Sequence, residues 1–350
     1  MRKVCFFINT LGASGGTQKM LVFLANLICD NFETIIYVKK QEKSFYRLNP
    51  NIKIHVDSNL FINYFLQNLK IYKFCIKQNV DFFVNLDSNT YLLNGFILPN
   101  KTKLIIWEHF SLESNSPKLL FRLSRWFALK NAFKFVLLSE YEFQLWKTKY
   151  SLKDSKLEII NNPITIKSVG TDNNLFLHKK FIAIGNNIDV KGFDLLIEAW
   201  SKLKPKDWAL EIIGLDDLEI EKLKIKIDEL KLEKISLTKR LLNIEQKYNS
   251  SSVFCLTSRK EAYPLVLIES QAKGLPAILF DSCSGALEII KDSNSSIIVK
   301  SFDTKKYSDV MQKFIDNQYD YKQLSVNSVN NGLKFNPHFF KKKWLNIFNK

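Results

Sequence analysis

The first half of the chain places its hydrophobic residues in short runs, separated by longer stretches of mixed polarity. Short apolar runs bounded by polar residues are typical of buried strands, and most stretches between them repeat apolar residues at helical spacing. This alternation of strand and helix predicts a doubly wound α/β domain. We expect its strands at Val4–Ile8, Thr34–Val38, Ile52–Val56, Phe82–Leu86, Leu104–Trp107 and Phe135–Leu138.

The second half repeats the pattern after an interruption. Asn161, Asn162 and Pro163 stop regular structure, and the polar residues 165–178 place the domain boundary close behind them. We therefore expect domains at residues 1–165 and 166–335, with a final helical segment at residues 336–350. The strands expected in the second domain are Phe181–Ile184, Ala209–Ile213, Val253–Leu256, Ala277–Phe280 and Ile297–Val299, and residues 217–236 read as one helix with a solvated face.

Composition agrees with two ordinary globular domains, because the chain has 350 residues of which 46% are hydrophobic. The five cysteines are scattered and odd in number, and Cys5 and Cys255 fall in expected strands. This usage favours a reducing compartment and a cytoplasmic protein over a disulfide framework. No spacing of cysteine and histidine suggests a metal site. We expect neither a signal peptide nor a membrane-spanning segment, since the apolar runs are too short.

The net charge of +16 raises two further possibilities, nucleic acid and an anionic membrane surface. We find no nucleic-acid-binding module, so nucleic acid is not an expected partner, and lysine-rich codon usage explains part of the excess. Residues 117–134 read as a helix in which apolar and aromatic residues interleave with basic ones, and such a helix can lie on an anionic bilayer. An ordinary core helix with a basic outer side is the alternative. The basic residues concerned are Lys118, Arg122, Arg125, Lys130 and Lys134.

Two carboxylates, Glu261 and Glu269, stand on either side of a predicted helix start, which Pro264 marks as a first-turn residue. Glu261 is expected in the loop and Glu269 about one turn inside the helix. The N–H groups of Leu265 and Val266 lie between them, and a helix N-terminus attracts anions. This arrangement suits a ligand with hydroxyls at both ends and a diphosphate in the middle, such as a nucleotide sugar. The ordinary alternative is a helix cap beside a solvated face.

Two further segments are candidates for ligand contact. The glycine loop around Gly15 and Gly16 joins the first strand to a helix that begins near Thr17, and its backbone can approach a phosphate or a sugar. It lacks the spacing of the dinucleotide-binding fingerprint. His109 follows an expected strand and should lie at the carboxyl edge of the sheet, where open α/β folds bind ligands. A capping or surface histidine is the alternative.

The segment RKEAYPLVLIESQAKG, residues 259–274, resembles the E-x7-E signature of retaining glycosyltransferases with the GT-B fold, in particular glycosyltransferase family 4, also called glycosyl transferases group 1. Ala262 stands where that signature usually has glycine. Other segments resemble further motifs of the family. They are Gly15, Gly16 and Gln18; Glu108 and His109, with Trp107 in place of a small residue; Lys191, Gly192 and Phe193; and Ser284, Gly285 and Glu288.

The resemblance implies two Rossmann-like domains facing across a cleft, with the last helix, His338–Asn349, crossing back to the first domain. It implies that Glu261 and His109 face the donor sugar, that Glu269 holds the ribose, and that Gly285 lines the donor pocket. Lys191 would bind the diphosphate as a point charge. Gly185 and Asn186 follow the same strand and belong to the expected donor site, but Asn186 replaces the usual arginine. Losing that ligand would cost about 1.5–3 kcal/mol unless Arg259 or Lys260 compensates.

The function implied is transfer of a hexosyl or N-acetylhexosaminyl unit, with retention of configuration, from a UDP-linked sugar to a lipid-linked oligosaccharide or lipopolysaccharide. No metal and no cofactor besides the donor are expected. The expected place is the cytoplasm, at the inner face of the inner membrane. A non-catalytic GT-B protein that binds sugar or a partner is the alternative, which Asn186 and Ala262 permit. The sequence identifies neither the sugar, the base nor the linkage.

Overall fold

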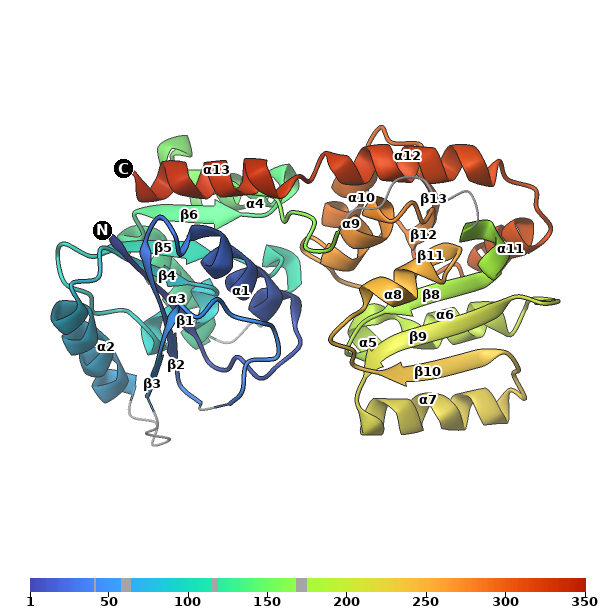
Figure 1. The fold of residues 1–350 in the computed structure, drawn as a ribbon, viewed down its shortest axis with the longest axis horizontal. Coiled ribbons are helices and arrows are strands. Elements are labelled where there is room, and N and C mark those ends of the chain that lie inside the picture. The colour runs from blue at the N-terminus through green and yellow to red at the C-terminus, as the bar shows by residue number, and fades with distance from the viewer. Residues whose placement is uncertain (41, 58–63, 115–118, 168–174) are drawn as a thin grey trace. The chain divides into compact units, whose positions relative to one another are not determined.

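A computed structural model describes residues 1–40, 42–57, 64–114, 119–167 and 175–350 (Figure 1). The chain forms two compact units. The first contains Met1–Asn162 together with His338–Lys350, and the second contains Pro163–Pro337. The expected boundary at residues 165–178 falls partly on residues 168–174, which lie outside the described residues.

The first unit is built on a parallel sheet with the strand order β3-β2-β1-β4-β5-β6-β7. The expected strands are confirmed within a residue or two. β7 was not expected, because its three residues run directly into a segment whose sequence indicates a linker. The register pairs Val4 with Phe82 and Phe135 with Leu157. The strands are β1 (Lys3–Ile8), β2 (Glu33–Val38), β3 (Lys53–Val56), β4 (Phe82–Asn85), β5 (Lys103–Trp107), β6 (Lys134–Leu137) and β7 (Leu157–Ile159).

Helices cover both faces of this sheet. Ser139 caps α4 by accepting a hydrogen bond from the Glu142 N–H at 3.1 Å, as a serine before an apolar helix predicts. The helices are α1 (Gly16–Ile28), α2 (Tyr64–Gln78), α3 (Leu119–Asn131), α4 (Glu140–Tyr150) and the last helix α13 (Pro337–Phe348), with 3₁₀ turns at Ser88–Leu93, Leu112–Ser114 and Asp154–Lys156.

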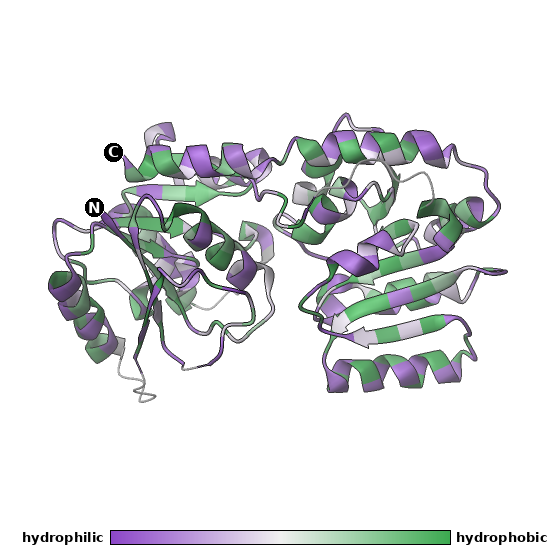
Figure 2. Cartoon of the chain, in the orientation of Figure 1, coloured by the Kyte–Doolittle hydropathy of each residue, from purple (hydrophilic) through white to green (hydrophobic). Residues whose placement is uncertain are grey.

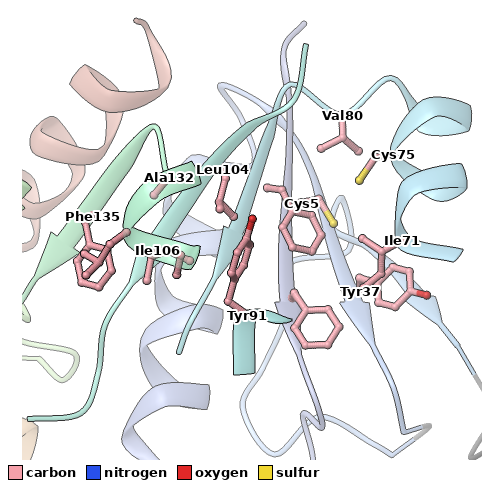
Figure 3. Close-up of a cluster of buried hydrophobic side chains, with 14 of the residues drawn as sticks. Cys5, Tyr37, Ile71, Cys75, Val80, Tyr91, Leu104, Ile106, Ala132 and Phe135 are labelled. Carbon is pink, nitrogen blue, oxygen red and sulfur yellow. The ribbon is translucent and has the colours of Figure 1, made fainter. Parts of the chain in front are cut away.

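The core of the first unit has two sides, because successive strand side chains point to opposite faces. On one side Leu104 and Ile106 of β5 join Cys5, Tyr37 and residues of α2 in a buried cluster (Figure 3). On the other side α13 fills the space. Its Phe348 lies edge-on against Phe32 and Phe82, with ring centroids 5.4 and 5.3 Å apart. The last helix is thus an integral part of the first unit, which its aromatic residues favoured.

The second unit holds a parallel sheet in the order β10-β9-β8-β11-β12-β13. Most of its strands are largely hydrophobic, while the edge strand β10 (Ile235–Lys239) mixes polar and apolar residues (Figure 2). The helix expected over residues 217–236 ends earlier than predicted, since α7 spans Asp217–Glu229 and the chain then enters β10. Leu223 is its one buried residue, which agrees with a solvated face. The strands are β8 (Lys180–Ile184), β9 (Ala209–Leu215), β10 (Ile235–Lys239), β11 (Val253–Leu256), β12 (Ala277–Phe280) and β13 (Ser296–Val299).

Short helices follow several of these strands and bring the candidate residues to the carboxyl edge of the sheet. The helices of this unit besides α7 are α5 (Ile188–Lys191), α6 (Phe193–Trp200), α8 (Glu245–Asn249), α9 (Leu265–Ala272), α10 (Ser284–Ile290), α11 (Thr304–Ile315) and α12 (Tyr321–Leu333), with a 3₁₀ turn at Leu175–His178.

Candidate functional site

The strand order of the second unit reverses between β8 and β11. These strands are neighbours, with Phe181 beside Val253, and the chain continues from β8 to one side and from β11 to the other. In open α/β sheets, ligands bind outside the carboxyl ends of the strands at such a reversal. The short helix α5 that follows β8 ends with Lys191, and the loop after β11 carries Glu261. Two predicted site residues therefore meet where the fold favours a ligand.

Lys191 and Glu261 form an ion pair between the lysine Nζ and the glutamate Oε1. Their side chains are only 17% and 14% exposed, so neither points into bulk water. The Ser258 hydroxyl donates a hydrogen bond to the same Oε1 at 3.0 Å. A cation and an anion thus lie together at the edge of the sheet, shielded from most of the solvent.

Glycines shape the path of Lys191. A Cβ on Gly185 would lie 2.4 Å from the Lys191 Cγ, so the lysine side chain runs directly over the end of β8. Gly192 has φ +63°, and a Cβ there would lie 2.1 Å from the Thr257 carbonyl oxygen. The Thr257 hydroxyl in turn donates to the Lys191 carbonyl at 2.9 Å. Only glycine permits this close approach.

The helix after Glu261 begins as expected, with one difference. Pro264 is the cap residue immediately before α9 and lies outside the first turn, and it offers no side-chain cap. The earliest intrahelical bonds reach Pro264 from Leu267 and Ile268, at 3.2 and 3.4 Å. The N–H groups of Leu265 and Val266 precede these bonds and lack intrahelical partners. The helix end keeps the partial positive charge that an anion needs.

Glu269 lies one turn inside α9 and is 1% exposed. One oxygen accepts from the Thr165 hydroxyl, and the other accepts from the Tyr248 hydroxyl at 3.1 Å. Burial, together with the neighbouring carboxylate, raises the pKa of Tyr248 well above its usual value, which keeps the phenol protonated and donating. Glu269 is therefore a carboxylate placed among hydroxyl groups, deep in the second unit.

The loop after β12 closes against the loop after β11. A Cβ on Gly285 would lie 1.7 Å from the Ala262 carbonyl oxygen, so this position requires glycine. The Ser282 hydroxyl donates to the Ser258 carbonyl at 2.7 Å. Gly285 is therefore next to the segment that holds Glu261.

Arg259 is already engaged. Its two terminal nitrogens each donate to one oxygen of Asp194 at 2.7 Å, and one of them also donates to the Asp189 carbonyl at 2.8 Å. Burial opposes ionisation of Asp194, but the guanidinium prevails and lowers the pKa of that carboxyl. Asn186 is exposed and has a neutral side chain. The charge that the usual arginine would supply at residue 186 is thus not replaced by a free guanidinium at residue 259.

The remaining candidates lie in the first unit. Gly15 is the cap residue of α1 and makes no side-chain cap, and Gly16 begins the helix, so this helix end also presents backbone N–H groups. His109 follows β5 and its ring contacts Trp107 in a tilted arrangement, with ring centroids 4.5 Å apart. Its Nε2 is buried without a hydrogen-bond partner, and desolvation lowers the His109 pKa to about 3. The ring is therefore neutral at neutral pH.

Glu108, beside His109, is a structural acid. It is buried, and its carboxyl oxygen Oε2 accepts from the Ser88 hydroxyl and from the Ser88 N–H, the latter at 3.2 Å. Burial and the nearby Asp87 carboxylate raise the pKa of Glu108 to about 8. The side chain is thus held by the loop after β4, and His109 alone of the pair has a polar atom without a partner.

The expected membrane-facing helix needs a correction. Arg125 is 4% exposed, donates to Asn89 Oδ1 at 2.7 Å and to the Tyr150 hydroxyl at 3.3 Å, and thus belongs to the interior. Lys134 is buried in β6 and pairs with Glu158 at 2.8 Å. Lys118 lies outside the described residues. The exposed residues of α3 are Leu119, Leu120, Arg122, Leu123, Trp126 and Lys130, together with Asn131 at its end.

Sequence reasoning missed several partners of the site residues, namely Thr165, Asp194, Tyr248, Thr257 and Ser258. Only Asp194 offered a signal, because it directly follows Lys191, Gly192 and Phe193 and because β8 and β11 were expected in one sheet. Within the described ranges, none of the helices has the length and apolar character to cross a membrane.

Residues 175–331 match the family model described as Glycosyl transferases group 1. The chain is 28% identical over 340 residues to an uncharacterized glycosyltransferase of Haemophilus influenzae, covering 94% of both proteins. It is 26% identical to the amylovoran biosynthesis glycosyltransferase AmsD of Erwinia amylovora, covering all of both.

A third relative is the GalNAc-alpha-(1->4)-GalNAc-alpha-(1->3)-diNAcBac-PP-undecaprenol alpha-1,4-N-acetyl-D-galactosaminyltransferase of Campylobacter jejuni, 24% identical over 99% of this chain and 98% of that protein.

Solved structures share the fold over the whole chain. The lipopolysaccharide outer core galactosyltransferase WaaB, in its apo form, superimposes with a TM-score of 0.72 at 17% identity, covering 99% of both chains. Anabaena Alr3699/HepE in complex with UDP-glucose gives 0.80 at 14% identity, covering all of both. Residues 175–331 belong to the family Glycosyl transferases group 1, and the chain is a glycosyltransferase with the GT-B fold.

Proposed function

We propose that the chain transfers a hexosyl or N-acetylhexosaminyl unit from a UDP-linked sugar to a lipid-linked oligosaccharide or lipopolysaccharide, with retention of configuration and without a metal. The observation that carries this proposal is the Lys191–Glu261 ion pair at the strand reversal, ahead of the uncapped N-terminus of α9. A nucleotide sugar offers a diphosphate for the cation and hydroxyls for the anion.

When the donor binds, its diphosphate replaces the Glu261 carboxylate as the anion that pairs with Lys191. The lysine ammonium and the N–H groups of Leu265 and Val266 are donors without acceptor capacity, which suits a phosphate oxygen. Once the phosphate neutralises Lys191, the Glu261 carboxylate becomes available to accept hydrogen bonds from sugar hydroxyls. Lys191 therefore has an anion beside it before and after binding, and the Ser258 hydroxyl together with the sugar hydroxyls donates to the Glu261 carboxylate once the lysine has left it.

Glu269 takes the ribose. Its two oxygens already accept from the hydroxyls of Thr165 and Tyr248, and the ribose 2′- and 3′-hydroxyls offer the same chemistry. The neutral His109, with its unpartnered Nε2, is assigned to a sugar hydroxyl, where an uncharged acceptor or donor is needed.

In the reaction the bond between the sugar C1 and the diphosphate oxygen breaks, and the acceptor oxygen forms a bond to C1. The acceptor proton passes to the departing diphosphate, which thus acts as the base on the same face of the sugar. Lys191 and the α9 N-terminus stabilise the negative charge that develops on the leaving group. Glu261 orients the sugar while C1 carries positive charge.

The names of similar proteins support the proposed donor and acceptor classes. HepE was solved in complex with UDP-glucose, WaaB is named a lipopolysaccharide outer core galactosyltransferase, and the Campylobacter relative is named for an undecaprenol-linked acceptor. The exposed face of α3 supports an acceptor held at a bilayer, since Leu119, Leu123 and Trp126 lie beside Arg122 and Lys130.

The test is to incubate the purified chain with UDP- and GDP-linked sugars and lipid-linked acceptors, and to measure nucleotide release and product mass. Transfer from a UDP sugar, with the α-linked donor giving an α-linked product by NMR, supports the proposal. UDP binding without transfer or hydrolysis across the donor and acceptor panel supports the alternative of a non-catalytic sugar-binding subunit, which the exposed, neutral Asn186 favours.

A further inference from the structure

A second ion pair, Asp194–Arg259, lies next to the Lys191–Glu261 pair in sequence and in space. We infer that Asp194 and Arg259 form a clamp that positions Lys191 against Glu261, and that Arg259 is not itself a ligand of the donor diphosphate. The inference rests on the proposed function of the Lys191–Glu261 site and assigns two further residues to it as positioning residues.

The clamp joins the two loops that follow β8 and β11. The Arg259 N–H donates to the Val190 carbonyl at 2.8 Å, and the Arg259 guanidinium donates to the Asp189 carbonyl at 2.8 Å. The Thr257 hydroxyl donates to the Lys191 carbonyl at 2.9 Å. Three consecutive carbonyls at the end of α5 are therefore satisfied from the other loop, where a four-residue helix cannot satisfy them itself.

The guanidinium geometry argues against a direct role in phosphate binding. Both terminal nitrogens of Arg259 face the two oxygens of Asp194, which is the planar match that makes arginine–carboxylate pairs specific. A phosphate would have to displace that carboxylate and leave Asp194 without its partner. Lys191 faces no such obstacle, because its own partner Glu261 gains sugar hydroxyls when the phosphate arrives.

The position of Lys191 depends on this junction. Lys191 is the last residue of α5, and Gly192 turns the chain into α6, on which Asp194 lies. Arg259 lies two residues before Glu261. One clamp therefore fixes the backbone on both sides of the ion pair, and a functional group held by a supporting contact keeps the geometry that binding requires.

The test uses UDP binding by calorimetry and donor turnover for the wild type, Asp194→Asn, Arg259→Gln and the double variant. The clamp predicts that both single variants have the same kind of defect, weaker UDP binding or a lower kcat, of about fivefold or more. It also predicts that the double variant is no more impaired than the more impaired of the two single variants, because each substitution removes the same interaction. Asp316→Asn, which breaks the Lys206–Asp316 pair of the same unit, is the matched control.

A diphosphate-binding Arg259 predicts the opposite sign for one variant. Asp194→Asn would then release the guanidinium and leave UDP binding equal or tighter, and that result overturns the clamp. Arg259→Lys serves as a second variant, because it keeps the charge but cannot form the paired contact. The clamp predicts loss in Arg259→Lys, and wild-type UDP binding and turnover in that variant also overturn it.

The two proposals fail differently. A wild-type chain that neither binds UDP nor turns over any nucleotide sugar contradicts the proposed function, whatever the clamp does. A wild-type chain that binds and turns over its donor, with Asp194→Asn unimpaired, retains the function and removes the clamp. Circular dichroism and thermal unfolding of every variant confirm that a loss of binding does not reflect loss of the fold.

Discussion

Trp344 of the last helix lies edge-on against Trp107 of β5, with ring centroids 4.8 Å apart and ring planes at 65°. Both side chains are fully buried, and Trp107 in turn contacts the His109 ring, with ring centroids 4.5 Å apart. A residue near the end of the chain therefore supports the strand end on which a candidate site residue lies. This contact gives the first testable prediction.

Replacing Trp344 with alanine should lower the free energy of unfolding of the first unit by about 3–5 kcal/mol, because it removes a large buried ring and leaves a cavity. Urea unfolding followed by circular dichroism measures this loss. Phe339→Ala, on the same helix but 60% exposed, is the control and should change stability little. Equal effects of the two variants would contradict the packing described here.

Glu261→Gln and Lys191→Ala should each lower donor turnover by more than tenfold while the fold stays intact. Glu261→Gln keeps the size of the side chain but loses the charge that pairs with Lys191, and Lys191→Ala removes the cation for the diphosphate. Lys191→Ala should also weaken UDP binding. Steady-state kinetics with the donor found for the wild type provide the measurement, and full activity in either variant would refute its assigned role.

Glu108 and His109 should make the free energy of unfolding depend on pH in opposite directions. The His109 pKa is lowered to about 3, so its contribution is present above pH 6.5 and is lost as the pH falls from 6.5 towards 3. The Glu108 pKa is raised from 4.5 to about 8, so its contribution is present below pH 4.5 and is lost as the pH rises from 4.5 to 8. Between pH 6.5 and 8, only the Glu108 contribution of this pair changes.

Glu108→Gln should therefore flatten the dependence of unfolding free energy on pH between 6.5 and 8. The change in slope is at most about 1.4 kcal/mol per pH unit, since one proton is involved. Urea unfolding at several pH values in this window measures the slope. Glu113→Gln, at an exposed neighbouring position, should leave it unchanged. A wild-type slope in Glu108→Gln would show that the buried carboxyl does not titrate there.

Charge reversal at two arginines of α3 should have different effects, because Arg122 is exposed and Arg125 is buried. Arg122→Glu changes an exposed cation beside Leu119, Leu123 and Trp126, and should reduce binding to liposomes with anionic lipids while the protein stays folded. Arg125→Glu buries an acid where the guanidinium now bonds Asn89 and Tyr150, and should destabilise the first unit by about 3 kcal/mol or more.

Liposome sedimentation and thermal unfolding measure these two effects independently. Lys149→Glu, an exposed charge reversal on α4, is the control for net charge alone. If Arg122→Glu and Lys149→Glu bind liposomes equally well, the face of α3 has no special part in membrane attachment.

The fold was predictable where strands are buried on both faces, because such strands read as continuous apolar runs. β7 and β10 escaped prediction for physical reasons. β7 has three residues, and β10 alternates partly exposed residues along the edge of the sheet, so neither forms an apolar run. The helix starts at α1 and α9 followed from glycine and proline, to within one residue.

The site was predictable as a set of residue types but not as a set of partners. Lys191 and Glu261 were expected near one diphosphate. Their direct ion pair, however, depends on the register of β8 beside β11, and that register cannot be read from the sequence. Arg259 read as a spare cation because Asp194 is far from it in the chain. Arg125 read as a surface cation because helical spacing gives no sign of the buried Asn89 and Tyr150 groups that receive it.

The division of the chain into units has a consequence for biosynthesis. The first unit needs Trp344 and Phe348, which leave the ribosome after every residue of the second unit. Domains generally fold as units in the order of synthesis, but here one apolar face of the sheet that is made first stays uncovered until α13 has been made. The later unit can therefore finish folding before the earlier one.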